Sequence, residues 1–187
     1  MTDLRQRLLR GDASLCFWGM GYVGFSAAAF FASRGVRVVG VDPDPRKVAA
    51  VREGRCPVRG FDAWLRAAGV DPAPRIRAGA LAADIASEWG VVAHHVAVPT
   101  ERDGHPYEDA LLDACRAIAY RFGSDSTVVI ESTVAPAMLD AVEAATPGLH
   151  LVAAPRRDWF DSPDRHLGAL PRIFGSDETA ALVRVAD

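Results

Sequence analysis

The sequence is poor in cysteine, in lysine and in long apolar runs, and neither sign of charge dominates it. Its three cysteines are far apart and form no C-x-x-C pair, so we expect neither a disulfide scaffold nor a zinc site. The longest apolar stretch, residues 25–32, is far shorter than a membrane span, and the charged N-terminus lacks the apolar segment of a signal peptide. A formal net charge of −3 gives no general attraction for nucleic acid or anionic membranes. We therefore expect a cytoplasmic protein without metal, nucleic-acid or membrane partners.

The residues that are abundant indicate a globular α/β protein. Arginine and alanine are frequent and Lys47 is the only lysine, which is typical of a GC-rich bacterial genome. With 187 residues, 50% of them hydrophobic, the chain can form one domain that buries roughly 70% of its extended surface. From residue 14 short apolar runs alternate with helix-period stretches, which predicts a doubly wound parallel sheet of the Rossmann type. The predicted strands are residues 15–18, 36–41, 76–78, 91–98, 128–130 and 149–153, and the clearest predicted helices are residues 109–122 and 137–145.

Three segments follow from this pattern. Residues 1–13 are predicted to form a helical extension, and residues 14–154 the dinucleotide-binding domain. Residues 155–187 are predicted to form a tail, with a short strand at Ile173-Phe174 and a helix from about Ser176, which packs on the same domain.

A glycine-rich loop follows the first predicted strand and opens a helix. Its G-x-G-x-x-G pattern suits a pyrophosphate, because the first glycine allows a tight turn, the second a close approach to the backbone, and the third close helix–strand packing. Asp42 ends the second strand, where a carboxylate would bind the adenosine ribose and favour NAD over NADP, while Arg46 nearby softens that preference. The candidate cofactor-binding residues are Gly19, Met20, Gly21, Tyr22, Val23, Gly24, Asp42 and Arg46, with Val98, Pro99, Thr100 and Ser132 at later strand ends.

Candidate catalytic groups lie where the later strands end, because ligands of such sheets bind beyond the carboxyl ends of the strands. Glu101 and His105 are in the segment after the fourth strand and could transfer a proton, although a loop histidine is commonly only solvated. Arg156 and Arg157 are either an anion clamp or a solvated surface pair.

For the histidines and aromatic residues of this region, a functional role and a core role are both possible. His94 and His95 alternate within the fourth strand, and a core role is favoured over a catalytic one. Trp159-Phe160 could stack on a base or close a dimer interface, and an ordinary core role is the default.

Four ordered segments of the sequence resemble the NAD-binding domain of the UDP-glucose/GDP-mannose dehydrogenase family. They are Phe17-Trp18-Gly19-Met20-Gly21-Tyr22-Val23-Gly24, Gly40-Val41-Asp42 with Lys47-Val48, Val96-Ala97-Val98-Pro99-Thr100, and Glu131-Ser132-Thr133-Val134. The resemblance runs over about residues 14–181. It implies NAD binding and oxidation of the primary alcohol of a nucleotide sugar to a carboxylate.

The resemblance covers the cofactor half of the family's pattern better than the catalytic half. The family's threonine after the fifth strand corresponds to Thr133, which implies a contact with water or a substrate hydroxyl. The family's glutamate after the sixth strand corresponds to Arg156, a reversal of charge, and the family's cysteine nucleophile lies in a later region that this sequence does not contain. The candidate catalytic residues are Thr133, Glu101, His105 and Arg156.

These observations leave three hypotheses. The first is an NAD-dependent oxidoreductase that makes one two-electron hydride transfer on a phosphorylated or nucleotide-bearing polar substrate. A homodimer is expected with it, since a lone domain leaves the nicotinamide open to water. The second is a non-redox enzyme, an isomerase, epimerase, lyase or transferase, that uses the same nucleotide pocket. The third is a non-catalytic dinucleotide-binding module.

Overall fold

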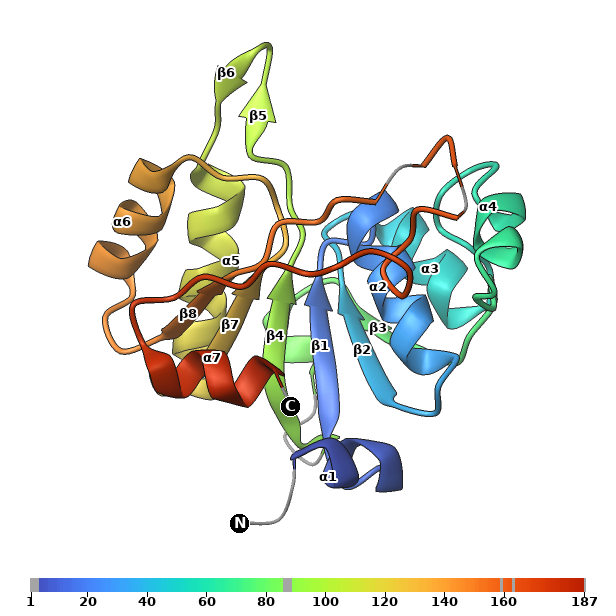
Figure 1. The fold of residues 1–187 in the computed structure, drawn as a ribbon, viewed down its shortest axis with the longest axis horizontal. Helices are drawn as coiled ribbons and strands as arrows, with labels where there is room; N and C mark the ends of the chain where they lie inside the picture. The colour runs from blue at the N-terminus through green and yellow to red at the C-terminus, as the bar shows by residue number, and fades with distance from the viewer. Residues whose placement is uncertain (1–3, 86–88, 159, 163, 187) are drawn as a thin grey trace.

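The computed structural model describes residues 4–85, 89–158, 160–162 and 164–186. Trp159, a candidate for base stacking, therefore lies outside the described residues. Figure 1 shows a central sheet with helices on both faces, which confirms the α/β prediction.

The sheet has six strands in the order β3-β2-β1-β4-β7-β8, and every neighbouring pair is parallel. Since the order reverses direction between β1 and β4, the carboxyl ends of these two strands form the switch point at which ligands of such folds bind. The strands are β1 (Ser14–Trp18), β2 (Arg37–Val41), β3 (Arg77–Gly79), β4 (Val91–Val96), β7 (Thr127–Ile130) and β8 (His150–Ala153).

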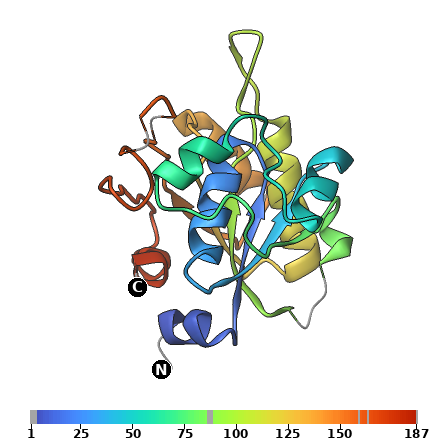
Figure 2. The ribbon, with the colours of Figure 1, turned by 90° about the vertical axis from the view of Figure 1, so that its right-hand side faces the viewer.

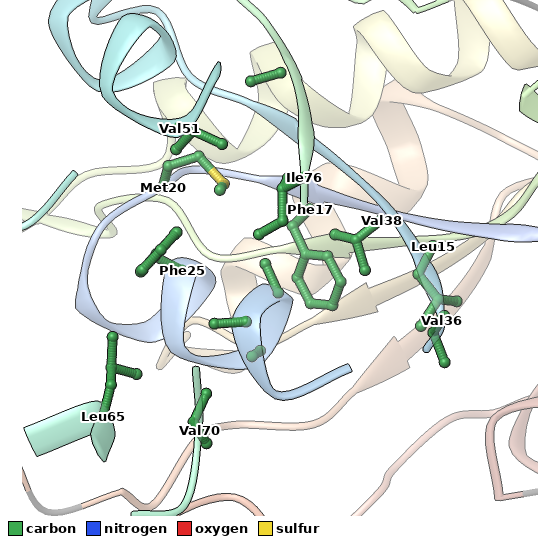
Figure 3. Close-up of a cluster of buried hydrophobic side chains, with 14 of the residues drawn as sticks. Leu15, Phe17, Met20, Phe25, Val36, Val38, Val51, Leu65, Val70 and Ile76 are labelled. Atoms are coloured by element: carbon green, nitrogen blue, oxygen red, sulfur yellow. The ribbon is translucent and has the colours of Figure 1, made fainter. Parts of the chain in front are cut away.

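Two apolar clusters hold the helices to the sheet. One lies on the face covered by α2 and contains Leu15, Phe17 and Phe25 (Figure 3). The other lies on the face covered by α5 and contains Cys16, Val96 and Ile118. Because successive side chains of a strand point to opposite faces, β1 contributes to both clusters. The helices are α2 (Tyr22–Ala32), α3 (Pro45–Arg52), α4 (Asp62–Ala67), α5 (Asp109–Phe122) and α6 (Pro136–Ala145).

The two ends of the chain add helices to this core. Helix α1 (Leu4–Arg10) lies at the amino-terminal end of β1, and α7 (Thr179–Ala186) packs beside β8. Between β8 and α7 the tail crosses in front of the sheet toward α2 and returns (Figures 1 and 2). The strand predicted in the tail is reduced to a single antiparallel bridge between Ala153 and Gly175.

The segment after β4 differs from the prediction. The strand ends at Val96, two residues earlier than predicted. A hairpin follows, with β5 (Glu101–Arg102) and β6 (His105–Pro106) projecting from the carboxyl edge of the sheet (Figure 1). Its turn residues Asp103 and Gly104 have φ of 55° and 78°, the conformation for which an Asp-Gly pair is favoured in two-residue hairpin turns.

Candidate functional site

The glycine loop joins β1 to α2 at the switch point. Gly19 has φ of 90°, and a Cβ there would lie 2.3 Å from the carbonyl oxygen of Ala97. A Cβ on Gly24 would lie 1.9 Å from the carbonyl oxygen of Gly19. The first and third glycines are therefore required by the packing of the protein itself.

Gly21 is different, because a Cβ at this position would meet nothing within 4 Å. Gly21 is also the N-cap of α2, where no described side chain makes a capping hydrogen bond, and Phe25 N–H donates to its carbonyl oxygen. The backbone N–H groups of the first turn are thus available to an anion, which the helix dipole also favours. The open space at Gly21 and the uncapped helix end together fit a pyrophosphate.

Asp42 follows β2 directly and faces the glycine loop. Its Oδ2 accepts hydrogen bonds from Met20 N–H at 2.7 Å and from Lys47 Nζ at 2.9 Å, while Oδ1 accepts one from Asp44 N–H at 2.9 Å. The carboxylate is therefore fixed beside the loop that would hold the pyrophosphate. Sequence reasoning did not assign Lys47 to the site, although its position five residues after Asp42, on the first turn of α3, was a usable signal.

Arg46 does not contact Asp42. Its guanidinium bonds both carboxylate oxygens of Asp44 at 2.9 and 3.0 Å, and its side chain is almost fully exposed. The hydrogen bonds from Arg46 lower the pKa of Asp44 to about 2. Asp44 also caps α3 by accepting a hydrogen bond from Arg46 N–H.

The segments after β4 and β7 lie together. Thr100 Oγ1 donates to the carbonyl oxygen of Thr133 at 2.6 Å, and Ser132 Oγ donates to that of Val98 at 2.7 Å. Glu101 and His105 are on the projecting hairpin and are exposed. The structure thus brings Thr100, Ser132 and Thr133 together, and it places the two candidate proton-transfer groups on an arm above them.

Arg156 points into the protein. Its side chain is 2% exposed and forms ion pairs with Glu131 at 3.1 Å and with Asp158. It also approaches Val23 O and Ser26 Oγ of α2, both at 3.4 Å. Burial disfavours its charge, but the two carboxylates outweigh burial and raise its pKa. With its charge already compensated, this guanidinium does not fit the anion-clamp interpretation, and only the neighbouring Arg157 is exposed.

Glu131 lies at the centre of this ion-pair cluster, at the end of β7. His95 Nδ1 is 2.8 Å from its Oε1, and Arg172 contributes a further ion pair at 3.5 Å. Burial raises the pKa of Glu131, but His95, Arg156 and Arg172 outweigh it and lower the pKa to about 2. Glu131 was expected only as part of the family resemblance, and its role in the cluster was not predicted, because its partners His95, Arg156 and Arg172 are distant in sequence.

Both histidines of β4 are buried, as a core role requires. His94 Nδ1 accepts a hydrogen bond from Trp18 Nε1 at 3.2 Å, and burial, with a smaller effect of His95, lowers its pKa to about 3. His95 stacks on the Phe17 ring, with 4.6 Å between ring centroids. His94 is therefore a neutral core residue at physiological pH.

Comparison with known proteins identifies the family to which the chain belongs. Residues 13–150 match the NAD binding domain of the UDP-glucose/GDP-mannose dehydrogenase family. The chain belongs to this family. Among curated relatives, a GDP-mannose 6-dehydrogenase of Pseudomonas putida is 28% identical over 127 residues, which are 65% of this chain and 28% of that protein. A UDP-N-acetyl-D-mannosamine dehydrogenase of Campylobacter jejuni is 32% identical over 124 residues, 64% of this chain and 28% of that protein.

Solved structures show the same fold. A ternary complex of GDP-mannose dehydrogenase from Pseudomonas aeruginosa superimposes with a TM-score of 0.71 at 20% identity, over 91% of this chain and 42% of that one. A UDP-glucose dehydrogenase from Pyrobaculum islandicum gives 0.69 at 25% identity, over 92% and 43%. The chain thus spans less than half the length of these relatives.

The described part of the chain contains no group of three or more histidine, cysteine or acidic residues that could hold a metal ion. Its three cysteines are free, and Cys16 and Cys115 are buried. No helix in the described ranges combines the length and apolarity that a membrane crossing needs.

Proposed function

We propose that this chain binds NAD at the carboxyl edge of its sheet and performs one two-electron hydride transfer on a phosphorylated or nucleotide-bearing polar substrate. The observation that carries the proposal is the open space at Gly21. No packing contact within the described protein requires a glycine at this position. Gly21 lies beside the uncapped first turn of α2, and the absence of a side chain there would allow a pyrophosphate to approach the backbone.

The groups around the loop fit the rest of the cofactor. Asp42 would accept hydrogen bonds from the adenosine ribose, and its negative charge disfavours a 2′-phosphate. Lys47 shares Asp42 Oδ2 with the loop and would keep the carboxylate oriented. Met20, Tyr22, Val23 and Gly24 would surround the pyrophosphate, and Val98, Pro99, Thr100 and Ser132 the nicotinamide side. Arg46 pairs with Asp44, the N-cap of α3, and would stabilise the start of that helix rather than contact the ribose.

NAD supplies the hydride acceptor, and the protein must position the substrate and accept a proton. Thr133 is exposed next to Thr100 and would hold the substrate hydroxyl or a water molecule. Glu101 or His105, on the hairpin, would take the proton when the arm lies over the edge. Arg156 would act as a positioning residue that holds the tail against α2. A homodimer would shield the open edge from water.

A non-redox reaction is the second candidate, and Arg156 favours it. The position at which the resemblance expects a glutamate is filled by a guanidinium whose charge is neutralised by Glu131 and Asp158. This position therefore offers no acid or base for the relatives' chemistry.

Calorimetric titration with NAD, NADH, NADP and NADPH tests the proposal. We expect NAD to bind more tightly than NADP, and Gly21→Ala to weaken NAD binding at least about tenfold without lowering the melting temperature, since the added Cβ meets no protein atom within 4 Å. Asp42→Asn should reduce the preference for NAD over NADP. Asp140→Asn, on the exposed side of α6, is the matched control and should change neither.

Each outcome decides between the hypotheses. If none of the four dinucleotides binds, the proposal is wrong. If NAD binds and a panel of sugar phosphates and nucleotide sugars yields one NADH per substrate oxidised, the single-transfer reaction is supported. Product formation with no net NADH would instead support the non-redox candidate.

A further inference from the structure

A groove of about 760 Å³ lies on the sheet face covered by α2, away from the glycine loop. Residues of α1, α2 and α7 line it. Its floor is formed by residues of β1, β4 and β7, among them Leu15, Ala93 and Val129. None of the residues assigned above to cofactor binding or catalysis lines it. We refer to it as the α2–α7 groove.

The walls of the groove are mainly apolar. Leu8 of α1, Phe31 of α2 and Val36, which precedes β2, line it together with the strand residues. Its volume is within the range of roughly 300–1,000 Å³ that is usual for small-molecule sites. An apolar ligand body of moderate size would therefore fit and would displace water from these side chains.

Three buried polar residues line the groove, namely His94, His95 and Thr127. His95 stacks on the Phe17 ring, on the face covered by α2. The His95 side chain is 10% exposed, and its Nδ1 is hydrogen-bonded to Glu131. The carboxylate of Glu131 can only accept, so the proton of that hydrogen bond belongs to Nδ1. Within the described residues no hydrogen bond uses Nε2, and Nε2 is not one of the fully buried unpartnered atoms, which are Trp64 Nε1 and Arg172 Nε. His95 Nε2 therefore retains accessible surface and can meet a ligand in the groove.

Arginine residues line the groove from three separate elements. Arg7 comes from α1, Arg34 from the turn after α2, and Arg184 from α7. Arg34 is fixed in place, because it stacks on the Phe30 ring at 3.4 Å and donates to the Phe30 carbonyl oxygen. The acidic group that lines the groove is Asp125, whose carboxylate is already bound to His150 at 2.6 Å. The groove is thus locally positive on a chain whose net charge is −3.

We propose that the α2–α7 groove is a second ligand site, which binds a small amphiphilic acid. The apolar body would lie over Leu15, Phe31 and Val129, and the carboxylate or other anionic group would pair with Arg34 and Arg184. A hydrogen-bond donor on the ligand would reach His95 Nε2. This site is independent of the proposed cofactor site, since the groove and the glycine loop use opposite ends of β1.

Binding of decanoate tests the proposal, with decyltrimethylammonium as a probe of similar chain length and opposite charge. Calorimetry should show saturable binding of one decanoate per chain, at least about tenfold tighter than the cation. Arg34→Glu and Arg184→Glu should each weaken decanoate at least about fivefold. Arg10→Glu is the matched control, because Arg10 is on α1 but does not line the groove, and it should leave binding unchanged.

Two further variants separate the contributions. His95→Asn places an amide nitrogen near the position of Nδ1, where it can still donate to Glu131, and removes Nε2. Decanamide, an uncharged probe with a hydrogen-bond donor, should therefore bind more weakly to this variant. Asp42→Asn should not affect decanoate, whatever it does to NAD.

Three results would overturn the proposal: equal affinity for decanoate and the cation, unchanged affinity in both charge-reversed variants, or an equal loss in Arg10→Glu. Sedimentation of the protein alone is the last check. A dimer that Arg184→Glu dissociates would mean that a second copy of the chain covers the groove, and the small-ligand proposal would then be wrong.

Discussion

Replacing Glu131 with glutamine removes the negative charge at the centre of the buried ion-pair cluster and preserves the shape of the side chain. Arg156, with 2% of its side chain exposed, would then keep only Asp158 as a carboxylate partner. Arg172 would lose its ion pair at 3.5 Å, and His95 would face an amide in place of a carboxylate. The variant therefore leaves buried positive charge that the native protein compensates.

The expected loss of stability follows from the burial. Breaking a buried ion pair by removing one partner costs about 3–5 kcal/mol, since the remaining charge stays desolvated. For a chain of this length each kcal/mol lowers the melting temperature by about 2–4 °C, so Glu131→Gln should melt roughly 6–20 °C lower. Glu143→Gln, at an exposed position on α6, is the control and should change stability by less than about 0.5 kcal/mol.

The assay is urea unfolding followed by circular dichroism, for Glu131→Gln, for Arg156→Met, for their combination and for the control Glu143→Gln. The double variant leaves Asp158 without its guanidinium, so it is not expected to regain native stability. Its loss should still be smaller than the sum of the two single losses, because the Glu131–Arg156 pair is broken in both single variants. A Glu131→Gln protein within about 1 kcal/mol of the native one would refute the reasoning, as would a double variant whose losses simply add.

Three further results are expected. Gly24→Ala should destabilise the protein even without ligand, as measured by melting temperature, because its Cβ would lie 1.9 Å from the Gly19 carbonyl oxygen; an unchanged melting temperature would contradict this. Hydrogen bonds to Asp125 and Glu178 raise the pKa of His150. Its contribution to the free energy of unfolding is therefore fully present below the ordinary histidine pKa and is lost as pH rises through the raised pKa. Unfolding measured over a pH series checks the sign, and the His150→Gln variant should lack this pH dependence. Maleimide labelling with mass analysis should modify Cys56 faster than the other two cysteines, which are buried, and equal rates would contradict the packing.

The sheet could be predicted from the sequence because its strands are short apolar runs with a strong local pattern. The helix at residues 109–122 was predicted with its observed ends, since an apolar stripe and a following glycine define it. Helix α4 was missed, because six residues are too few to show a period. The hairpin was missed as well, although Asp103-Gly104 carries the signal for its turn.

The candidate site likewise contains residues that local sequence patterns predict and residues that they do not. The roles of Gly19 and Gly24 follow from a local pattern, and the structure gives a steric reason for each. The role of Arg156 could not be predicted, since its partner Glu131 is 25 residues away and the pairing depends on how the tail folds back. Local patterns therefore identify the loop, while long-range ion pairs appear only in the folded chain.

The same ion pairs have a consequence for motion within the protein. Arg156 connects the start of the tail to β7 and to the first turn of α2, across the boundary expected at residue 154. Detaching residues 155–158 would break the buried ion pair between Arg156 and Glu131, so this stretch should open only together with the sheet. Hydrogen exchange should accordingly show its protected amide at Arg156, bonded to the Glu131 carbonyl oxygen, exchanging with the core strands. Local opening of the tail would begin farther along the chain, near the exposed residues Asp164 and Arg165.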